Sequence, residues 1–191
     1  MKLTNAVLVL FLTIGIPAAA VAQHGEIPKS IADSVADSLK YTEDEFYSVA
    51  DAMPDAKYGY IPTAGMFDGA RSFAEQVKHV ACSNFAFFNE IEGKTPPAHC
   101  EKGGTAPATT KPELLKYLKD SFDYGNKVLQ SINAKNALDR AQGPYAGPNT
   151  KLGLAVAAVW HIADHYGQIV EYLRMNAIVP PTTQKYGLKV R

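Results

Sequence analysis

The stretch TKPELLKYLKDSFDYGNKVLQSI, residues 110–132, decides the fold class. Its apolar positions recur at alternating steps of three and four residues, which places them on one stripe of an α-helix. The members of this stripe are Leu115, Leu118, Phe122, Gly125, Leu129 and Ile132. The opening Thr110-Lys111-Pro112-Glu113 has the pattern of a capping box with proline in the first turn. A one-sided helix must bury its stripe against other elements, so this stretch predicts one member of a helical bundle.

Three more helices are predicted around this one, because Gly and Pro clusters separate the apolar periodic stretches. They cover residues 29–53, 69–91 and 149 to 175 or 177, with Ser30 and Asn149 as N-caps of the first and the last. Apolar residues surround most of the last helix, which predicts contacts with several other helices. These residues are Leu152, Leu154, Val156, Val159, Trp160, Ile162, Ile169, Val170 and Leu173. No stretch alternates as a strand does, so we expect an all-α fold, a four-helix bundle with long crossover connections.

Two of the connections are long. Residues 55–67 are predicted to be an ordered loop, in which Tyr58, Tyr60 and Phe67 cap one end of the core. Residues 92–109 are rich in Gly, Pro, Thr and Lys and show no helical pattern. We expect this second connection to cross over an end of the bundle.

Residues 1–22 are predicted to be a signal peptide. Lys2 gives a minimal positive start, residues 6–16 form an apolar run, and Ala20-Val21-Ala22 fits a small-residue cleavage pattern. Cleavage before Gln23 leaves one helical domain, residues 23–191, that is exported, periplasmic or secreted, and has no membrane contact afterwards. An uncleaved anchor is the alternative, but the apolar run is shorter than the roughly 20 residues of a spanning helix.

The charge balance argues against a nucleic-acid partner. Nineteen Lys and Arg residues face nineteen Asp and Glu residues in the 191-residue chain, so the formal net charge is zero. The chain therefore lacks the net positive charge that favours nonspecific binding of nucleic acids. Hydrophobic residues make up 47 % of the chain, enough for one globular domain with its own core.

His161 and His165 stand four residues apart in the last predicted helix. A four-residue step turns by only about 40° and rises about 6 Å, so both imidazoles project from one face and can chelate one ion. Such an ion needs a third protein ligand, and His79 in the second predicted helix is the available donor. The alternative is that each is an ordinary hydrogen-bonded core or rim histidine. His24 and His99 are predicted to be solvated.

Several metalloenzyme patterns fail on these residues. Ile162 follows the first histidine of the pair where zincins need Glu. Residues 161–165 resemble the inverted pattern H-x-x-E-H with Asp164 in place of Glu, but the sole carboxylate after them, Glu171, lies on the same helix and is poorly placed as a third ligand. Glu75 precedes His79 by four residues, which breaks the Glu-x-x-His spacing of di-iron bundles. The chain also has no C-x-x-C-H haem motif. A metallopeptidase, a di-iron protein and a c-type cytochrome are therefore disfavoured.

Two stretches together resemble the DinB-like superfamily of four-helix bundles. They are SFAEQVKHVACSNFAFFNEI (residues 72–91), which holds His79, and VWHIADHYGQIVEYLRMNAIVPP (residues 159–181), which holds His161 and His165. Members of that family typically bind one divalent metal through one histidine of the second helix and two of the fourth. The resemblance therefore implies these three histidines as ligands of one ion, and imidazole suits zinc, nickel, iron or copper. It also implies transferase or related metal-dependent chemistry, since some members are thiol-dependent transferases and isomerases.

Three imidazole ligands would leave a coordination position open to water or substrate, as in catalytic metal sites. The ion would act as a Lewis acid and generate a nucleophile near neutral pH. Helical angles place Gln168 and Tyr172 on the stripe of His161, and Glu75 near the face of His79. These are the predicted catalytic residues, Glu75 as a general base and the other two as groups that orient a substrate.

Cys82 lies three residues after His79 and has three interpretations. A disulfide with Cys100 is favoured, because exported chains are oxidised and the connection is long enough to reach back along the helix. Cys82 as a fourth metal ligand and a pair of free thiols are the alternatives. The disulfide and the fourth ligand exclude each other.

The sequence thus predicts an exported protein with one divalent metal ion, zinc, nickel or iron, that acts as a hydrolase or transferase on a small-molecule substrate of unknown identity. A non-catalytic metal-binding or small-ligand-binding helical module is the alternative. A fourth protein ligand would favour the module, and an open coordination position would favour the enzyme. A homodimer is left open.

Overall fold

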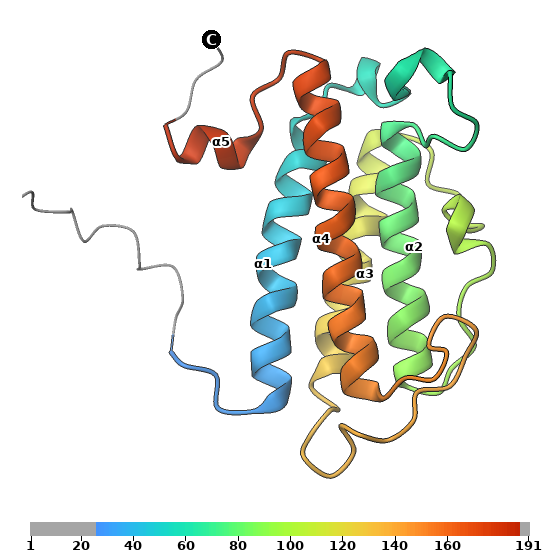
Figure 1. The fold of residues 1–191 in the computed structure, drawn as a ribbon, viewed down its shortest axis with the longest axis vertical. Coiled ribbons are helices and arrows are strands. Elements are labelled where there is room, and N and C mark those ends of the chain that lie inside the picture. Colours follow the sequence, from blue (N-terminus) through green and yellow to red (C-terminus); the bar gives the residue numbers. More distant parts are fainter. Residues whose placement is uncertain (1–25, 188–191) are drawn as a thin grey trace, which may run out of the picture.

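The computed structural model describes residues 26–187, and over this range the chain forms the predicted bundle of four long helices (Figure 1). The long helices are α1 (Ile31–Ala52), α2 (Phe73–Ile91), α3 (Lys111–Leu129) and α4 (Lys151–Met175). Short helical turns η1 (Asp55–Lys57), η2 (Pro62–Gly65) and η3 (Cys100–Lys102) lie in the connections, and α5 (Pro181–Lys185) follows α4. The predicted signal peptide lies outside the described residues.

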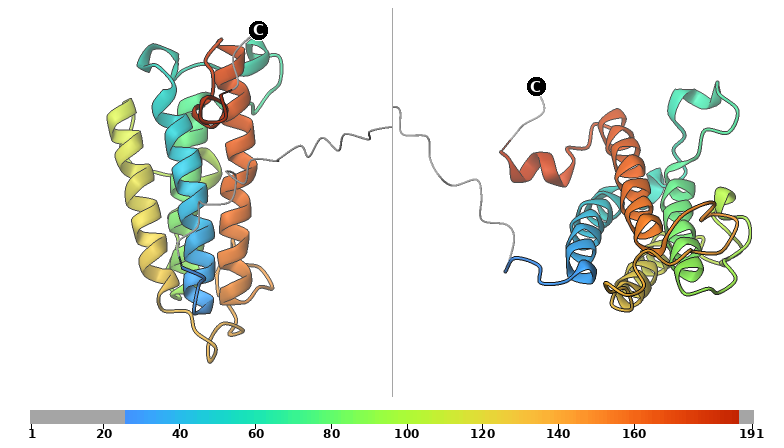
Figure 2. Two further views of the ribbon diagram at one scale, coloured as in Figure 1. Left: turned by 90° about the vertical axis from the view of Figure 1, so that its left-hand side faces the viewer. Right: turned by 60° about the horizontal axis from the view of Figure 1, so that its bottom comes forward.

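The helices α1 and α4 run in one direction, and α2 and α3 run in the opposite one (Figure 1). Both α1 and α2 pack against α3 and α4, so α1 and α2 occupy opposite corners of the bundle. The tilted right-hand view in Figure 2 shows the four long helices grouped side by side. This arrangement makes α2 and α4 antiparallel neighbours, which matters for the site between them.

The connection between α2 and α3 differs from the expectation. Because these neighbouring helices are parallel, residues 92–110 must return along the length of α2 before α3 can begin (Figure 1). The prediction that this connection crosses an end of the bundle is therefore wrong. On its way the connection places η3 against α2.

Helix α1 begins at the predicted cap, since the backbone amide of Asp33 donates to the Ser30 hydroxyl at 3.0 Å. The capping box of α3 is also confirmed, because the amide of Thr110 donates to the Glu113 carboxylate at 2.9 Å. Leu129 is the last residue of α3, although Ile132 remains buried beyond it.

Two helix starts need correction. The N-cap of α4 is Thr150 and not Asn149, because the Thr150 hydroxyl accepts the amide of Gly153 at 3.0 Å. Helix α2 begins at Phe73 and not at residue 69, since Gly69 has a φ of +83°, which a right-handed helix does not use. Ser72 supplies the cap of α2 instead, through a capping box that extends to residue 75.

The core lies between the four helices and contains the fully buried rings of Phe46, Phe73, Phe88 and Phe122. Tyr58 caps one end of this core as predicted: it is buried, and its hydroxyl donates to the carbonyl of residue 50 at 2.7 Å. The same role for Phe67 was wrongly predicted, since 65 % of that residue is exposed.

Helix α4 is not covered all round. Val156 and Trp160 are 54 % and 68 % exposed, against the expectation of a helix packed on most of its circumference. The reason is that α4 packs mainly against α1 and α2, which leaves its remaining side to solvent. No helix within residues 26–187 combines the length and the apolar character that a membrane crossing requires.

Candidate metal centre

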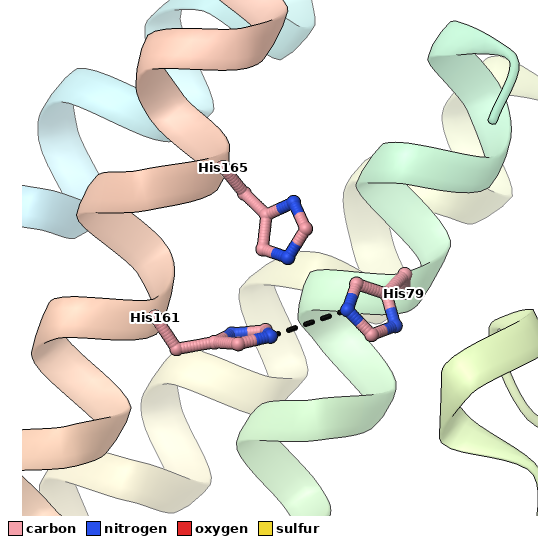
Figure 3. Close-up of side chains that lie close together, drawn as sticks. All are labelled: His79, His161 and His165. Atoms are coloured by element: carbon pink, nitrogen blue, oxygen red, sulfur yellow. Dashed lines mark hydrogen bonds between the residues drawn. The ribbon is translucent and has the colours of Figure 1, made fainter. Parts of the chain in front are cut away.

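Three histidines meet where α2 crosses the middle of α4 (Figure 3). His79 comes from α2, and His161 and His165 come from successive turns of α4. The ring centroids are 5.0 Å apart for His79 and His161, 4.7 Å for His79 and His165, and 4.5 Å for His161 and His165. One nitrogen of each ring lies within 4.8 Å of the others. The predicted convergence of the three imidazoles is confirmed.

The outward nitrogens of two rings fix which nitrogens face the centre. Nδ1 of His79 lies 2.6 Å from the carbonyl oxygen of Cys100, and a carbonyl can only accept, so Nδ1 carries the proton. Nδ1 of His165 likewise donates to Oε1 of Gln76 at 2.8 Å. Both rings therefore turn an unprotonated Nε2 toward the centre, which is the form that binds a metal ion.

Gln76 connects His165 to the surface of the protein. It is only 3 % exposed, and its Nε2 donates to Oε1 of Gln168 at 2.9 Å. The amide of Gln168 in turn donates to the carboxylate of Asp164 at 3.0 Å. This chain of hydrogen bonds fixes the amide orientation of Gln76, so that its oxygen faces the imidazole.

His161 completes the cluster. Its Nε2 lies 3.2 Å from Nε2 of His79, and its Nδ1 is buried with no hydrogen-bond partner in the structure. Two nitrogens that bind one zinc ion at ~2.0–2.1 Å with tetrahedral geometry stand about 3.3–3.4 Å apart. The observed separation is close to that value. The three imidazoles therefore fit the donor set of a single divalent ion.

The surroundings keep these imidazoles neutral. Burial, the other two histidines and the charge of Arg71 lower the pKa of His161 to about 3. Burial, His79 and Arg71 lower the pKa of His165 to about 4. Burial also lowers the pKa of His79, although the hydrogen bond to Cys100 opposes this shift. At neutral pH the lone pairs are thus available to a metal ion without loss of a proton.

An aromatic ring and one positive charge complete the environment. The ring of Phe87 meets the ring of His161 edge to face, at a centroid distance of 5.4 Å. Arg71 precedes α2, and its guanidinium donates to the carbonyl of Glu101 at 2.7 Å. Its charge acts on all three imidazoles and favours an anionic ligand at the centre.

Cys82 and Cys100 form the disulfide that the sequence favoured, with a Cα–Cα distance of 5.2 Å. Cys82 is therefore not a fourth ligand. Within residues 26–187, no further His, Cys, Asp or Glu joins the three-histidine cluster. His99, predicted to be solvated, has a side chain that is 70 % exposed.

The three predicted catalytic residues lie in different settings. Glu75 is exposed, and its carboxylate accepts the backbone amide of Ser72 at 2.7 Å as part of the α2 cap. Tyr172 is buried, and its hydroxyl donates to the carbonyl of Arg71 at 2.8 Å. Gln168 is hydrogen-bonded to Gln76, and Gln76 in turn is hydrogen-bonded to His165. A catalytic role for these residues stays a prediction.

Two groups that act on the histidines were missed at the sequence level. Gln76 lies three residues before His79, on the same side of α2, and this spacing is the signal that could have found it. The Cys100 carbonyl could have been found through the favoured disulfide, because Cys82 is one turn beyond His79. The cross-link brings the backbone of residue 100 to that turn.

The fold and the cluster define a four-helix-bundle protein with a candidate metal centre between its second and fourth helices. The family model of the DinB superfamily matches residues 38–169, more than half of the chain, and the chain belongs to this superfamily. A solved structure of a conserved protein from Enterococcus faecalis is similar in fold, with a TM-score of 0.59 and 16 % sequence identity. The match covers 75 % of this chain and 95 % of the other. Among curated proteins, no match was found.

Proposed function

We propose that this protein binds one divalent metal ion through His79, His161 and His165 and uses it in a hydrolase or transferase reaction on a small-molecule substrate. The observation that carries the proposal is the orientation of the imidazoles: two outward nitrogens are hydrogen-bonded, and three inward nitrogens converge. Zinc, nickel and iron all suit this donor set. When bound, the ion would supply Lewis-acid activation of a water or a thiol.

The residues around the cluster have separate tasks in this proposal. Gln76 and the Cys100 carbonyl orient two ligands, and Gln168 steadies Gln76. Arg71 supplies positive charge, which favours a substrate with a carboxylate or a phosphate group. Phe87 covers one side of His161 and limits the access of water there. Each task can be tested by substitution.

One observation favours a non-catalytic metal-binding or ligand-binding module as the second candidate. In the described part of the chain, no carboxylate lies within the cluster to act as a general base. Glu75, the predicted base, is bonded to the α2 cap instead. An enzyme built on this site would thus take its base from the substrate or from a co-substrate.

Export is proposed on two grounds. Residues 1–22 have the pattern of a signal peptide, and a buried disulfide is typical of proteins that fold in an oxidising compartment. Mass spectrometry of the mature protein from a secreting host tests this. A chain that begins at Gln23 in the periplasm or the medium supports export, and an intact residue 1 in the cytosol contradicts it.

Elemental analysis of the purified protein tests the metal site. We expect one metal ion per chain in the wild type and a loss of stoichiometric metal in His161→Ala. His99→Ala is the matched control, because it removes an exposed histidine outside the cluster. Equal metal contents in all three proteins would remove the proposed site.

A further inference from the structure

We propose that the Cys82–Cys100 disulfide positions a metal ligand: it holds the Cys100 carbonyl on Nδ1 of His79 and so keeps Nε2 of His79 unprotonated toward the metal. The inference deepens the proposed function and rests on it for the identity of the site as a metal centre. The juxtaposition of the disulfide, the carbonyl and the imidazole is given by the structure alone.

The geometry places the cross-link beside the ligand. Cys82 follows His79 by three residues, so both side chains leave the same side of α2. Both cysteines are fully buried, and residue 100 is the one whose carbonyl lies 2.6 Å from Nδ1 of His79. The covalent bond therefore acts on the same residue that orients the imidazole.

The segment around Cys100, residues 97–104, has few other anchors. Ala98, His99, Glu101 and Lys102 are exposed, and only Cys100 and Gly103 of this segment are buried. The guanidinium of Arg71 holds the carbonyl of residue 101, and this hydrogen bond lies at the surface. A Cβ atom at Gly104 would lie 2.4 Å from Sγ of Cys82, so the backbone follows the disulfide closely.

Loss of the cross-link would release the acceptor of a buried N–H group. Without the Cys100 carbonyl, the Nδ1–H group of His79 has no hydrogen-bond acceptor, so the tautomer with the proton on Nε2 is no longer disfavoured. In that tautomer Nε2 cannot bind a metal ion until it loses the proton. Loss of such an outer hydrogen bond typically weakens metal affinity by about 10–100-fold.

A purely structural disulfide would behave differently. A cross-link that closes a loop over 18 positions stabilises the fold whatever it does for His79. Its removal would then lower the melting temperature but leave the tautomer of His79 and the intrinsic zinc affinity unchanged. The tautomer is thus the readout that separates positioning from stability, and it needs no metal.

The test compares the oxidised wild type with the double variant Cys82→Ser/Cys100→Ser. Long-range ¹H–¹⁵N NMR of the metal-free proteins reports the tautomer of His79, and competition with a chromophoric chelator gives the dissociation constant for zinc. Val128→Ala serves as the control for lost stability, since this buried residue lies in the last turn of α3 and His79 lies in the second turn of α2. It keeps the disulfide and the Cys100 carbonyl.

If the serine variant does not fold, Cys82→Ala/Cys100→Ala replaces it, because alanine leaves no unpaired hydroxyl at these fully buried positions. The same NMR and zinc measurements are then made on the alanine variant.

We expect the wild type and Val128→Ala to show the Nδ1–H tautomer of His79 and similar zinc affinities. The double variant should show a mixture of tautomers and bind zinc about 10–100-fold more weakly. An unchanged tautomer together with unchanged affinity would overturn the inference and leave the proposed function intact. Absence of zinc binding by the wild type itself would overturn both, and this outcome is distinct because it does not depend on the cysteines.

Discussion

Replacement of Gln76 with leucine removes the acceptor of the Nδ1–H group of His165. In the wild type this hydrogen bond is 2.8 Å long and lies in a region where Gln76 is 3 % and His165 is 6 % exposed. Water therefore has little access to the group that is left behind. The second hydrogen bond of Gln76 goes to the half-exposed Gln168, where water can replace it.

The expected magnitude follows from this burial. A buried donor left without its partner costs about 1–3 kcal/mol of stability. For a domain of this size, 1 kcal/mol shifts the melting temperature by about 2–4 °C, so the variant should melt about 2–12 °C lower. The loss of a hydrogen bond behind a metal-binding imidazole should also weaken zinc affinity by about 10–100-fold.

Thermal unfolding of the metal-free proteins and zinc competition measure the two effects separately. Gln76→Glu is the matched control, because it keeps an oxygen acceptor facing His165 at the same chain length. Gln168→Ala is the comparison variant: it removes a partner of Gln76 but keeps the acceptor of His165, so we expect a smaller loss of stability and of zinc affinity than in Gln76→Leu. If Gln76→Leu kept both the melting temperature and the zinc affinity of the wild type, the assignment of Nε2 of His165 as the inward nitrogen would be wrong.

Four further outcomes are expected. Gly125→Ala should lower stability in urea unfolding by about 1–3 kcal/mol, because the added Cβ would lie 2.3 Å from the ring of Phe88. A Cβ added at Gly167 meets no atom within 4 Å, so Gly167→Ala should instead stabilise α4 by about 0.5–1 kcal/mol. If Gly125→Ala were the more stable of the two variants, the packing between α2 and α3 would be contradicted. The metal-free protein should lose stability as the pH falls. The folded pKa values of about 3 for His161 and about 4 for His165 lie below the unfolded value, so the unfolded state binds protons first. The free energy of unfolding is then highest above about pH 6.5. Below that pH it falls by up to about 1.4 kcal/mol per pH unit for each histidine, until the pH reaches the folded pKa of that histidine. Urea unfolding between pH 7.5 and 4 measures this, and a flat profile would count against the buried neutral cluster. Zinc at 100 times its dissociation constant should stabilise the wild type by about 2.7 kcal/mol and leave the melting temperature of His161→Ala unchanged; equal shifts in both proteins would place the ion elsewhere.

The local parts of the site were predictable from the sequence because they depend on helix geometry alone. His161 and His165 lie on one face of any α-helix that contains them, whatever the helix packs against. His79 was a different case, since it joins the pair only if α2 and α4 are neighbours. Its selection was correct because it is the one remaining histidine that falls in a predicted helix and not in a connection or at the start of the chain.

The groups that orient the imidazoles were harder to predict. In the sequence, Gln76 is an ordinary polar residue near the start of a helix. Its hydrogen bond to His165 depends on the side-chain rotamer and on the position of α4. The Cys100 carbonyl is a backbone atom in a connection without a periodic pattern. Its position follows from the return of that connection along α2, which in turn follows from the parallel direction of α2 and α3. The relative direction of two helices is a tertiary property, and the spacing of apolar residues along each helix does not indicate it.

The same limit explains the errors on α4. A helix with apolar residues on most sides gives no indication of which side a bundle leaves uncovered. Trp160 and Val156 were therefore counted among residues of a helix expected to contact several others, whereas within residues 26–187 α4 has two close neighbours, α1 and α2, and these two side chains are exposed. The capped helices α1 and α3 were predicted more accurately, because side chains that cap a helix are local signals.

The restraints on the three imidazoles are unequal, and this inequality has a chemical consequence. The outer nitrogens of His79 and His165 are both held by groups anchored on α2, one through the disulfide and one through Gln76. The outer nitrogen of His161 has no partner, and His161 is also the least buried residue of the three. Two donors are thus set in place by outer hydrogen bonds before an ion arrives, while the third is held by its 3.2 Å contact with Nε2 of His79 and by ring contacts. An ion or a ligand that reaches the centre would therefore be accommodated by movement of His161, so that substitutions beside this residue should change binding rates more than substitutions beside the other two.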